Sequence, residues 1–275
     1  MVNRDDYNER LVSAARSVML ELVRVLGEYK DEMIIIGGWV PALLLPSVSE
    51  SHVGSTDIDI ALDHRMAKEE AYKTIKALLE ERGYSEDERQ PYIFYRKVTV
   101  EGQEIAVEVD FLAGEYAGTG KSHRTQPVQD IRARKARGCE IALEMNKVLT
   151  IDGTLPGGTK DSARVRVASM VPFMVMKGMA VADRLKEKDA YDIYYCLKYF
   201  PGGLDALISE FRPHLGNRLV TEGLQKIAEK FASVDHFGPR AVADFNTVTD
   251  REEREQVQRD VFERVDYFLK GLNIR

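Results

Sequence analysis

The chain has 275 residues, 44% apolar and 31% charged, which suits one large globular domain or two modest ones. Its formal net charge of -6 argues against a protein that coats nucleic acid, because phosphate binding needs a positive surface, but leaves room for a local basic patch. The two cysteines have neither metal-site nor disulfide-framework spacing, the N-terminus lacks an apolar signal core, and no apolar run is long enough to span a membrane. We therefore expect a cytoplasmic protein with reduced thiols.

Short strands and helices alternate in the first part of the chain. Apolar residues at helical spacing predict a helix from about 5 to 29, and the run Met33–Ile36 before Gly37-Gly38 predicts a buried strand. The next predicted elements are a helix over 39–45, a strand over 56–62, a helix over 67–82, and strands over 92–100 and 104–112. Residues 113–138 predict mostly loop, and the segments 139–151 and 163–168 predict a hairpin.

Helical patterns replace this alternation after about residue 165. The expected helices cover 170–185, 188–199, 203–211, 217–233 and 250–271, with glycine and proline between them. The sequence thus predicts an α+β fold with two domains. Residues 1–165 would form a mixed sheet flanked by helices, and residues 166–275 an all-α domain.

Two aspartates on the strand over 56–62 are the first candidate site. Side chains alternate between the two faces of a strand, so Asp57 and Asp59 point to one side while Ile58 and Ile60 point into the core. Carboxylates about 7 Å apart repel each other, and a divalent cation such as Mg²⁺ between them removes the repulsion. A solvated sheet edge is the alternative explanation for the pair.

A third carboxylate and a glycine pair extend this site. If the strand over 104–112 lies beside the first, Asp110 completes a three-carboxylate cluster suited to two Mg²⁺ ions. One ion would hold a nucleoside triphosphate, and the other would activate an acceptor hydroxyl whose proton Asp110 accepts. Gly37-Gly38 between a strand and a helix lets backbone N–H groups approach a polyphosphate, although an ordinary strand-to-helix turn uses the same residues.

The order of these motifs resembles the polymerase-β-like nucleotidyltransferase superfamily. Its pattern is a strand, a glycine pair, a helix, a loop, an (S/T)xDxD strand and a later strand with one more aspartate. Ser55 occupies the Ser/Thr position here, and Thr56 follows it. The chain departs from the superfamily in the long interval 39–56 between the glycines and the aspartates, which predicts a longer loop.

A second candidate cluster lies on the helices predicted over 170–185 and 188–199. Lys177 is the charge inside an apolar run, so it needs either a partner or access to a cleft. Arg184 lies two turns later on the same face, and Asp189 and Asp192 are three residues apart on the next helix. Two interpretations remain open: a structural ion-pair network, or a site in which Lys177 grips the triphosphate and the aspartates orient it.

A lysine, then an arginine, then (R/K)DxxD resembles the AbiEii/AbiGii-type nucleotidyltransferases, which include toxins of type IV toxin–antitoxin systems. The resemblance covers about 33 to 200 in patches. It implies transfer of a nucleotide from an NTP to RNA, such as the tRNA acceptor end, and a cognate antitoxin. It places Gly37, Gly38, Ser55, Asp57 and Asp59 in the nucleotide and metal site, and Lys177 with Asp189 or Asp192 in the second pair.

Both clusters together give the expected functional residues. The expected catalytic residues are Asp57, Asp59, Asp110, Lys177, Asp189 and Asp192, and the first three are also the expected Mg²⁺ ligands. The expected nucleotide-binding residues are Gly37, Gly38, Ser55, Thr56, Lys177 and Arg184. The family often has an arginine shortly before the aspartate pair, whereas this chain has His52 in that region. His52 could substitute weakly for the arginine, but we expect a solvated loop residue.

Three functions fit these residues. The first is an Mg²⁺-dependent nucleotidyltransferase acting on RNA, and the second is one acting on a small aminoglycoside-like hydroxyl acceptor, which the acidic net charge slightly favours. The third is a non-catalytic nucleotide-binding module. A basic stretch could track an RNA backbone, although charge runs in loops are usually just solvated. It consists of Lys121, His123, Arg124, Arg132, Arg134, Lys135 and Arg137.

Overall fold

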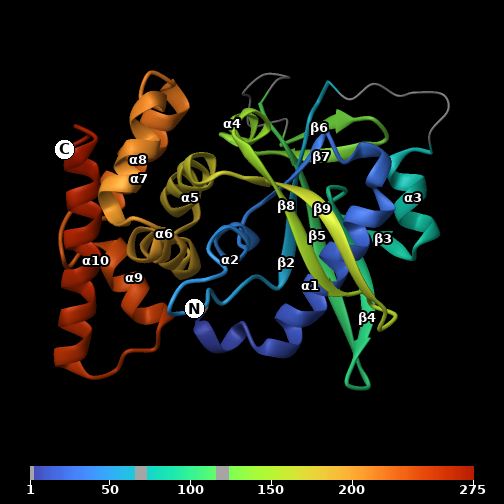
Figure 1. Cartoon of the computed structure of the whole chain (residues 1–275), viewed down its shortest axis with the longest axis horizontal. Coiled ribbons are helices and arrows are strands. Elements are labelled where there is room, and N and C mark those ends of the chain that lie inside the picture. Colours follow the sequence, from blue (N-terminus) through green and yellow to red (C-terminus); the bar gives the residue numbers. More distant parts are fainter. Residues whose placement is uncertain (1–2, 66–72, 116–123) are drawn as a thin grey trace. The chain divides into compact units, whose positions relative to one another are not determined.

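The structure is a computed structural model that describes residues 3–65, 73–115 and 124–275 (Figure 1). The chain divides into two compact units. An α/β unit comprises Asn8–Val40 and Gly54–Ser169, and a helical unit comprises Met1–Tyr7, Pro41–Val53 and Met170–Arg275. The chain therefore leaves the α/β unit after Val40, returns to it at Gly54 and leaves it again after Ser169.

A mixed β-sheet forms the centre of the α/β unit. Its strands are β1 (Met33–Ile36), β2 (Asp57–Leu62), β3 (Tyr84–Glu86), β4 (Ile93–Val100), β5 (Gln103–Ala113), β6 (Thr125–Val128), β7 (Ile131–Lys135), β8 (Asn146–Thr154) and β9 (Lys160–Ala168). The main order is β3-β4-β5-β2-β1-β9-β8, and β7 joins β6 to β5. Strand β2 runs parallel to β5 and antiparallel to β1, so it lies in the middle of the sheet.

Helices pack against this sheet. They are α1 (Glu9–Val25), α3 (Ile75–Glu81) and α4 (Cys139–Glu144), and a 3₁₀ turn η2 (Gly27–Tyr29) follows α1. Helix α1 contacts β2, β4, β5, β8 and β9, and its buried face includes Ala14, Val18 and Leu22. The Asn8 side chain accepts a hydrogen bond from the Leu11 N–H and so caps the first turn of α1.

The second unit is helical. Its elements are η1 (Arg4–Asp6), α5 (Met170–Arg184), α6 (Glu187–Tyr199), α7 (Gly203–Phe211), η3 (Arg212–His214), α8 (Arg218–Lys230), α9 (Phe237–Phe245) and α10 (Arg251–Gly271). Helix α5 packs on α6 and α8, and α6 also packs on α7, α9 and α10. The residues of α2 (Trp39–Leu44) from Pro41 onward belong to this unit as well. Among the described residues, no helix is long and apolar enough to cross a membrane.

The predicted fold class, a mixed α/β part followed by helices, is confirmed. Two local predictions in the α/β unit were wrong. Residues 139–144 form helix α4 instead of a strand, because Ala, Leu and Glu favour a helix and Gly138 (φ 89°) makes the turn that precedes it. The segment expected to be a loop contains the two-stranded ribbon β6–β7, and on β7 the buried residues Ile131 and Ala133 alternate with Arg132 and Arg134.

Three shorter elements also differ from the prediction. Strand β3 and helix α9 were not predicted, because β3 has only three residues and α9 contains Gly238 and Pro239. Of the helix expected over 67–82, the described part is α3, which begins after the capping side chain of Thr74. Residues 66–72 lie outside the described part of the chain.

Helices α5 and α8 approach each other at two glycines, which gives a test of the packing. A Cβ on Gly178 would lie only 2.3 Å from the Gly223 carbonyl oxygen. We expect Gly178→Ala to lower the free energy of unfolding by about 1–3 kcal/mol in urea denaturation, because the helices must move apart. Gly216→Ala is the control, since nothing lies within 4 Å of its Cβ. Equal losses in the two variants would contradict close packing as the cause.

Candidate active site

The turn after β1 brings Gly37 against Asp59. Ile36 lies opposite Asp59 in the antiparallel β1–β2 ladder, so Gly37 is the next residue along. Its φ is +67°, and a Cβ there would lie 1.9 Å from Asp59 Oδ2. Glycine alone combines this left-handed conformation with the absence of a side chain. The position of the Asp59 carboxylate therefore requires a glycine at residue 37.

The second glycine and the start of α2 position Asp57. A Cβ on Gly38 would lie 2.5 Å from Ser55 Oγ, and that hydroxyl donates a hydrogen bond to the Asp57 carboxylate. The buried indole N–H of Trp39 donates to the Asp57 backbone carbonyl at 2.8 Å. The beginning of β2 is thus held through both the side chain and the backbone of Asp57.

Strands β2 and β5 place their carboxylates side by side. Asp59 is in register with Asp110, and Asp57 is in register with Glu108. Neighbours in register on paired strands share a face, so all four carboxylates belong to one face of the sheet. We call these four residues the carboxylate face. Glu108 was not among our candidate residues, although the alternation along its strand already put it on the same side as Asp110.

Asp110 is the most deeply buried member of the carboxylate face. It is 7% exposed. Burial raises the pKa of Asp110 to about 7; Arg134 opposes this rise and Asp59 adds to it. Asp110 Oδ2 accepts a hydrogen bond from Arg134 Nη2, whereas Oδ1 is buried and has no hydrogen-bond partner among the described residues. A buried oxygen without a partner is costly, so this side of Asp110 suits a bound ligand.

The donor set of the carboxylate face fits Mg²⁺, which prefers carboxylate oxygens. The free Asp110 Oδ1 is the observation that supports this fit. In the described part of the chain, no three His, Cys, Asp or Glu side chains are already gathered as ligands of one ion. Bonds to Ser55 and Arg134 hold Asp57 and Asp110 in their present orientations.

The second predicted cluster forms a buried ion-pair network within the helical unit. Lys177 Nζ lies 2.7 Å from Asp189 Oδ1 and 2.7 Å from Asp192 Oδ2, the latter as an ion pair without hydrogen-bond geometry. Arg184 Nε pairs with Asp189 Oδ2 at 2.7 Å, and Lys188 pairs with Asp192. This geometry matches the structural network considered from the sequence, because both partners of Lys177 are protein carboxylates.

The cations of this network keep its aspartates ionised. Burial alone would raise the pKa of Asp189 and Asp192, but Lys177 lowers both, helped by Arg184 at Asp189 and by Lys188 at Asp192. Burial would lower the pKa of Lys177, yet the two aspartates raise it. Removing one partner of such a buried pair typically costs about 3–5 kcal/mol, so loss of Lys177, Asp189 or Asp192 should destabilise the helical unit.

His52 belongs to the same network, and our expectation of a solvated loop residue was wrong. Its Nε2 lies 2.9 Å from Asp192 Oδ1, and its side chain is fully buried. The ring stacks on Tyr191 and meets the edge of Tyr195, with centroids 5.5 and 4.7 Å away. Burial, followed by the charge of Lys188, lowers the pKa of His52 to about 4, so the imidazole is neutral near pH 7.

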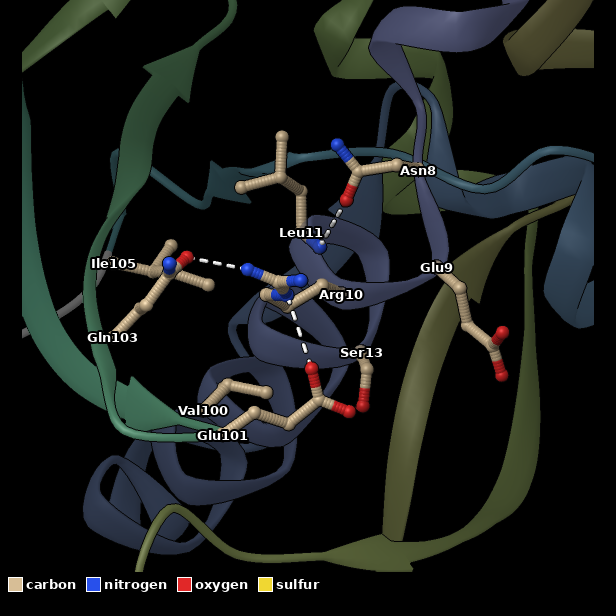
Figure 2. Close-up of a pocket in the computed structure, with 9 residues that line it drawn as sticks. All are labelled: Asn8, Glu9, Arg10, Leu11, Ser13, Val100, Glu101, Gln103 and Ile105. Carbon is tan, nitrogen blue, oxygen red and sulfur yellow. Dashed lines mark hydrogen bonds and ion pairs between the residues drawn. The ribbon is translucent and has the colours of Figure 1, made fainter.

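A hollow elsewhere in the α/β unit contains none of the predicted site residues. It has a volume of about 640 Å³ and lies between the start of α1 and the β4–β5 hairpin (Figure 2). Arg10 crosses it, with an ion pair to Glu101 at 3.2 Å and a hydrogen bond to Gln103 (Figure 2). The cation in this hollow, Arg10, is therefore already paired with the hairpin.

Comparison with known proteins identifies the class. The chain matches the family model described as "Nucleotidyl transferase AbiEii toxin, Type IV TA system" over residues 22–273. It is therefore a nucleotidyltransferase, and it belongs to the AbiEii family, as the order of its motifs predicted. A search of curated protein sequences finds no match.

Two solved structures from Helicobacter pylori are similar to this chain. JHP933 is 13% identical with a TM-score of 0.45, and the match covers 97% of this chain and 94% of that protein. The other, described as a provisional nucleotidyltransferase, is 12% identical with a TM-score of 0.42, and the match covers 94% of this chain and 96% of that one.

The contact between Gly37 and Asp59 predicts the effect of a single methyl group. We expect Gly37→Ala to slow nucleotidyl transfer by about 100-fold or more, because the new Cβ displaces the Asp59 carboxylate. Gly102→Ala is the matched control: its φ is +79°, but nothing lies within 4 Å of its Cβ. Both variants bear backbone strain, and only the first has the clash. Equal transfer rates would contradict the importance of the contact.

The buried His52 predicts a pH dependence of stability. The unfolded chain protonates His52 near pH 6.5, whereas the folded protein keeps it neutral down to about pH 4. Between these values the unfolded state binds more protons, so the free energy of unfolding falls as pH falls. From pH 7.5 to 5, wild type should lose about 2 kcal/mol more than His52→Gln in urea denaturation. Parallel pH profiles would contradict this assignment.

Proposed function

We propose that this nucleotidyltransferase uses Mg²⁺ to move an NMP from an NTP to a hydroxyl group of RNA, with the tRNA acceptor end as the expected site. We further propose that it acts as a toxin with a cognate antitoxin, in line with the description of its family. The observation that carries the proposal is the register that puts Asp59 beside Asp110 on adjacent strands.

The carboxylate face has the groups that this reaction needs. Asp57, Asp59 and Asp110 would hold Mg²⁺, which when bound neutralises phosphate charge and lowers the pKa of an acceptor hydroxyl. In our proposal Asp110 also accepts the proton of the acceptor hydroxyl. The acceptor oxygen then bonds to the α-phosphorus. The bond between the α-phosphorus and the oxygen that bridges it to the β-phosphorus breaks, and pyrophosphate leaves.

The residues around the carboxylate face would position the triphosphate. The turn at Gly37 and Gly38 would offer its backbone to phosphate oxygens, while the space that side chains would occupy there is filled by Asp59 and Ser55. Ser55 already donates to Asp57 and would keep that carboxylate oriented. Thr56, the residue before β2, is half-buried and would contribute its hydroxyl to nucleotide binding.

The buried network of the helical unit would contribute in a different way. In our proposal, Lys177, Asp189 and Asp192 position α5 and α6 relative to each other, because their charges are turned toward one another. Arg184 is the member that reaches solvent, with 44% of its side chain exposed. Arg184 is therefore the residue of this network best placed to contact a phosphate.

The ribbon β6–β7 supports an RNA acceptor over a small molecule. Strand β7 pairs with β5, the strand of Asp110, and so brings basic residues to the carboxylate face. Arg124 and Arg132 of this segment are exposed. Exposed arginines beside a reactive site suit the phosphate backbone of RNA. Lys121 and His123 of the same basic stretch lie outside the described residues.

Transfer of label tests this function. We expect the protein with Mg²⁺, an α-labelled NTP and total tRNA to label the tRNA. Asp59→Asn should reduce the rate at least about 100-fold, because the site loses one of its negative charges. Asp152→Asn, which changes an exposed aspartate on β8, is the control and should retain the rate.

The acceptors separate the candidate functions. Labelling of an aminoglycoside but not of RNA would favour the small-molecule alternative. No transfer to RNA, protein or small acceptor from any of the four NTPs would contradict the proposed reaction. Label transfer by Asp59→Asn at the wild-type rate would contradict the proposed site.

A further inference from the structure

Arg134 contacts the carboxylate face, although we expected it only in a basic loop. It lies on β7, donates from Nη2 to Asp110 Oδ2, and its guanidinium carbon lies 5.7 Å from the centroid of the Tyr92 ring. Among the described residues, Asp110 is the hydrogen-bond partner of its side chain, and its buried Nε has none. A guanidinium has five N–H donors, so this arginine is held by few of the bonds it can make.

A divalent cation bound to Asp110 would lie close to Arg134 and compete with it for the carboxylate. Arg134 occupies Oδ2, while Oδ1 is buried with no hydrogen-bond partner in the described part of the chain. A divalent cation on Oδ1 would lie within a few ångströms of the guanidinium, since the two oxygens belong to one carboxylate. Like charges this close weaken each other's binding, more so where burial lowers the effective dielectric constant.

We propose that Arg134 and the divalent cation compete for Asp110, so that Arg134 holds the carboxylate only until the cation binds. The released guanidinium then binds a phosphate oxyanion of the substrate, for which its planar fork is suited. Its side chain is 36% exposed, so it can swing away from Asp110 without leaving a closed core. This inference rests on the proposed function, because it takes Asp110 as a cation ligand.

Cation affinity without nucleotide measures the competition directly. Mn²⁺ titration followed by electron paramagnetic resonance should show about 10-fold tighter binding to Arg134→Gln than to wild type, the scale expected for loss of one neighbouring like charge. Arg134→Lys keeps the charge and should bind Mn²⁺ within about 3-fold of wild type. Arg89→Gln removes an exposed charge between β3 and β4 and should leave the Mn²⁺ affinity unchanged.

Once released, the Arg134 guanidinium should contribute to phosphate binding. At saturating Mn²⁺, Arg134→Gln and Arg134→Lys should each weaken binding of NTP or of tRNA by about 10-fold, because neither offers a bidentate fork. Weaker NTP binding would assign Arg134 to the triphosphate, and weaker tRNA binding to the acceptor backbone. Unchanged affinity for both would overturn the release of Arg134 to substrate.

The failures of the two proposals are distinguishable. Equal Mn²⁺ affinities of wild type, Arg134→Gln and Arg89→Gln would overturn the competition while leaving the metal site in place. Weaker Mn²⁺ binding by Arg134→Gln together with a lower unfolding temperature would show a purely structural role and also overturn it. No Mn²⁺ binding by wild type would overturn the metal site and this inference with it. If Arg134→Gln does not fold, Arg134→Lys decides: unchanged NTP and tRNA affinities would overturn the inference.

Discussion

The contact between the Gly37 backbone and the Asp59 carboxylate is the constraint on which the site depends. With a Cβ position only 1.9 Å from Asp59 Oδ2, residue 37 has no room for a side chain. The contact fixes Asp59 relative to β1, and the parallel β2–β5 register then carries that position across to Asp110. The indole of Trp39, two residues after Gly37, holds the Asp57 carbonyl from the same turn. One strand-to-helix turn therefore positions both aspartates of β2.

This turn also explains why the long interval between glycines and aspartates is tolerated. The two ends of the interval lie close together, because a Cβ on Gly38 would lie 2.5 Å from Ser55 Oγ. Between them, Pro41–Val53 belongs to the helical unit and supplies His52 to the network of α5 and α6. The entropy of closing a loop grows only slowly with its length, so the extra residues need not disturb the glycine–aspartate geometry. The extra residues are therefore an excursion of the chain into the helical unit, and Gly38 still lies close to Ser55.

Local pattern was enough to predict the strands of the carboxylate face. The alternation of Asp57 and Asp59 with buried isoleucines determines which side of β2 is polar, and buried Val107, Val109 and Phe111 do the same for β5. The pattern could not give contacts between distant residues. His52 meets Asp192, 140 residues away, and Arg134 meets Asp110, 24 residues away. The same limit explains the missed ribbon: its buried residues alternate with so many charges that only pairing of β7 with β5 makes the strand recognisable.

Both clusters contain buried aspartates, but Asp189 and Asp192 of the helical unit each have more cationic partners than Asp110 of the carboxylate face. Asp189 has Lys177 and Arg184 as partners, and Asp192 has Lys177, Lys188 and the imidazole of His52. Among the described residues, Asp110 has a single ion pair, between its Oδ2 and Arg134, whereas Asp192 Oδ2, which likewise lacks a hydrogen bond, is paired with Lys177. Because a buried carboxylate is stable only when it is compensated, the first two are complete within the protein, whereas Asp110 is not. Loss of activity on changing Lys177 would therefore not by itself identify a catalytic lysine, since the same change leaves two buried aspartates short of a cation.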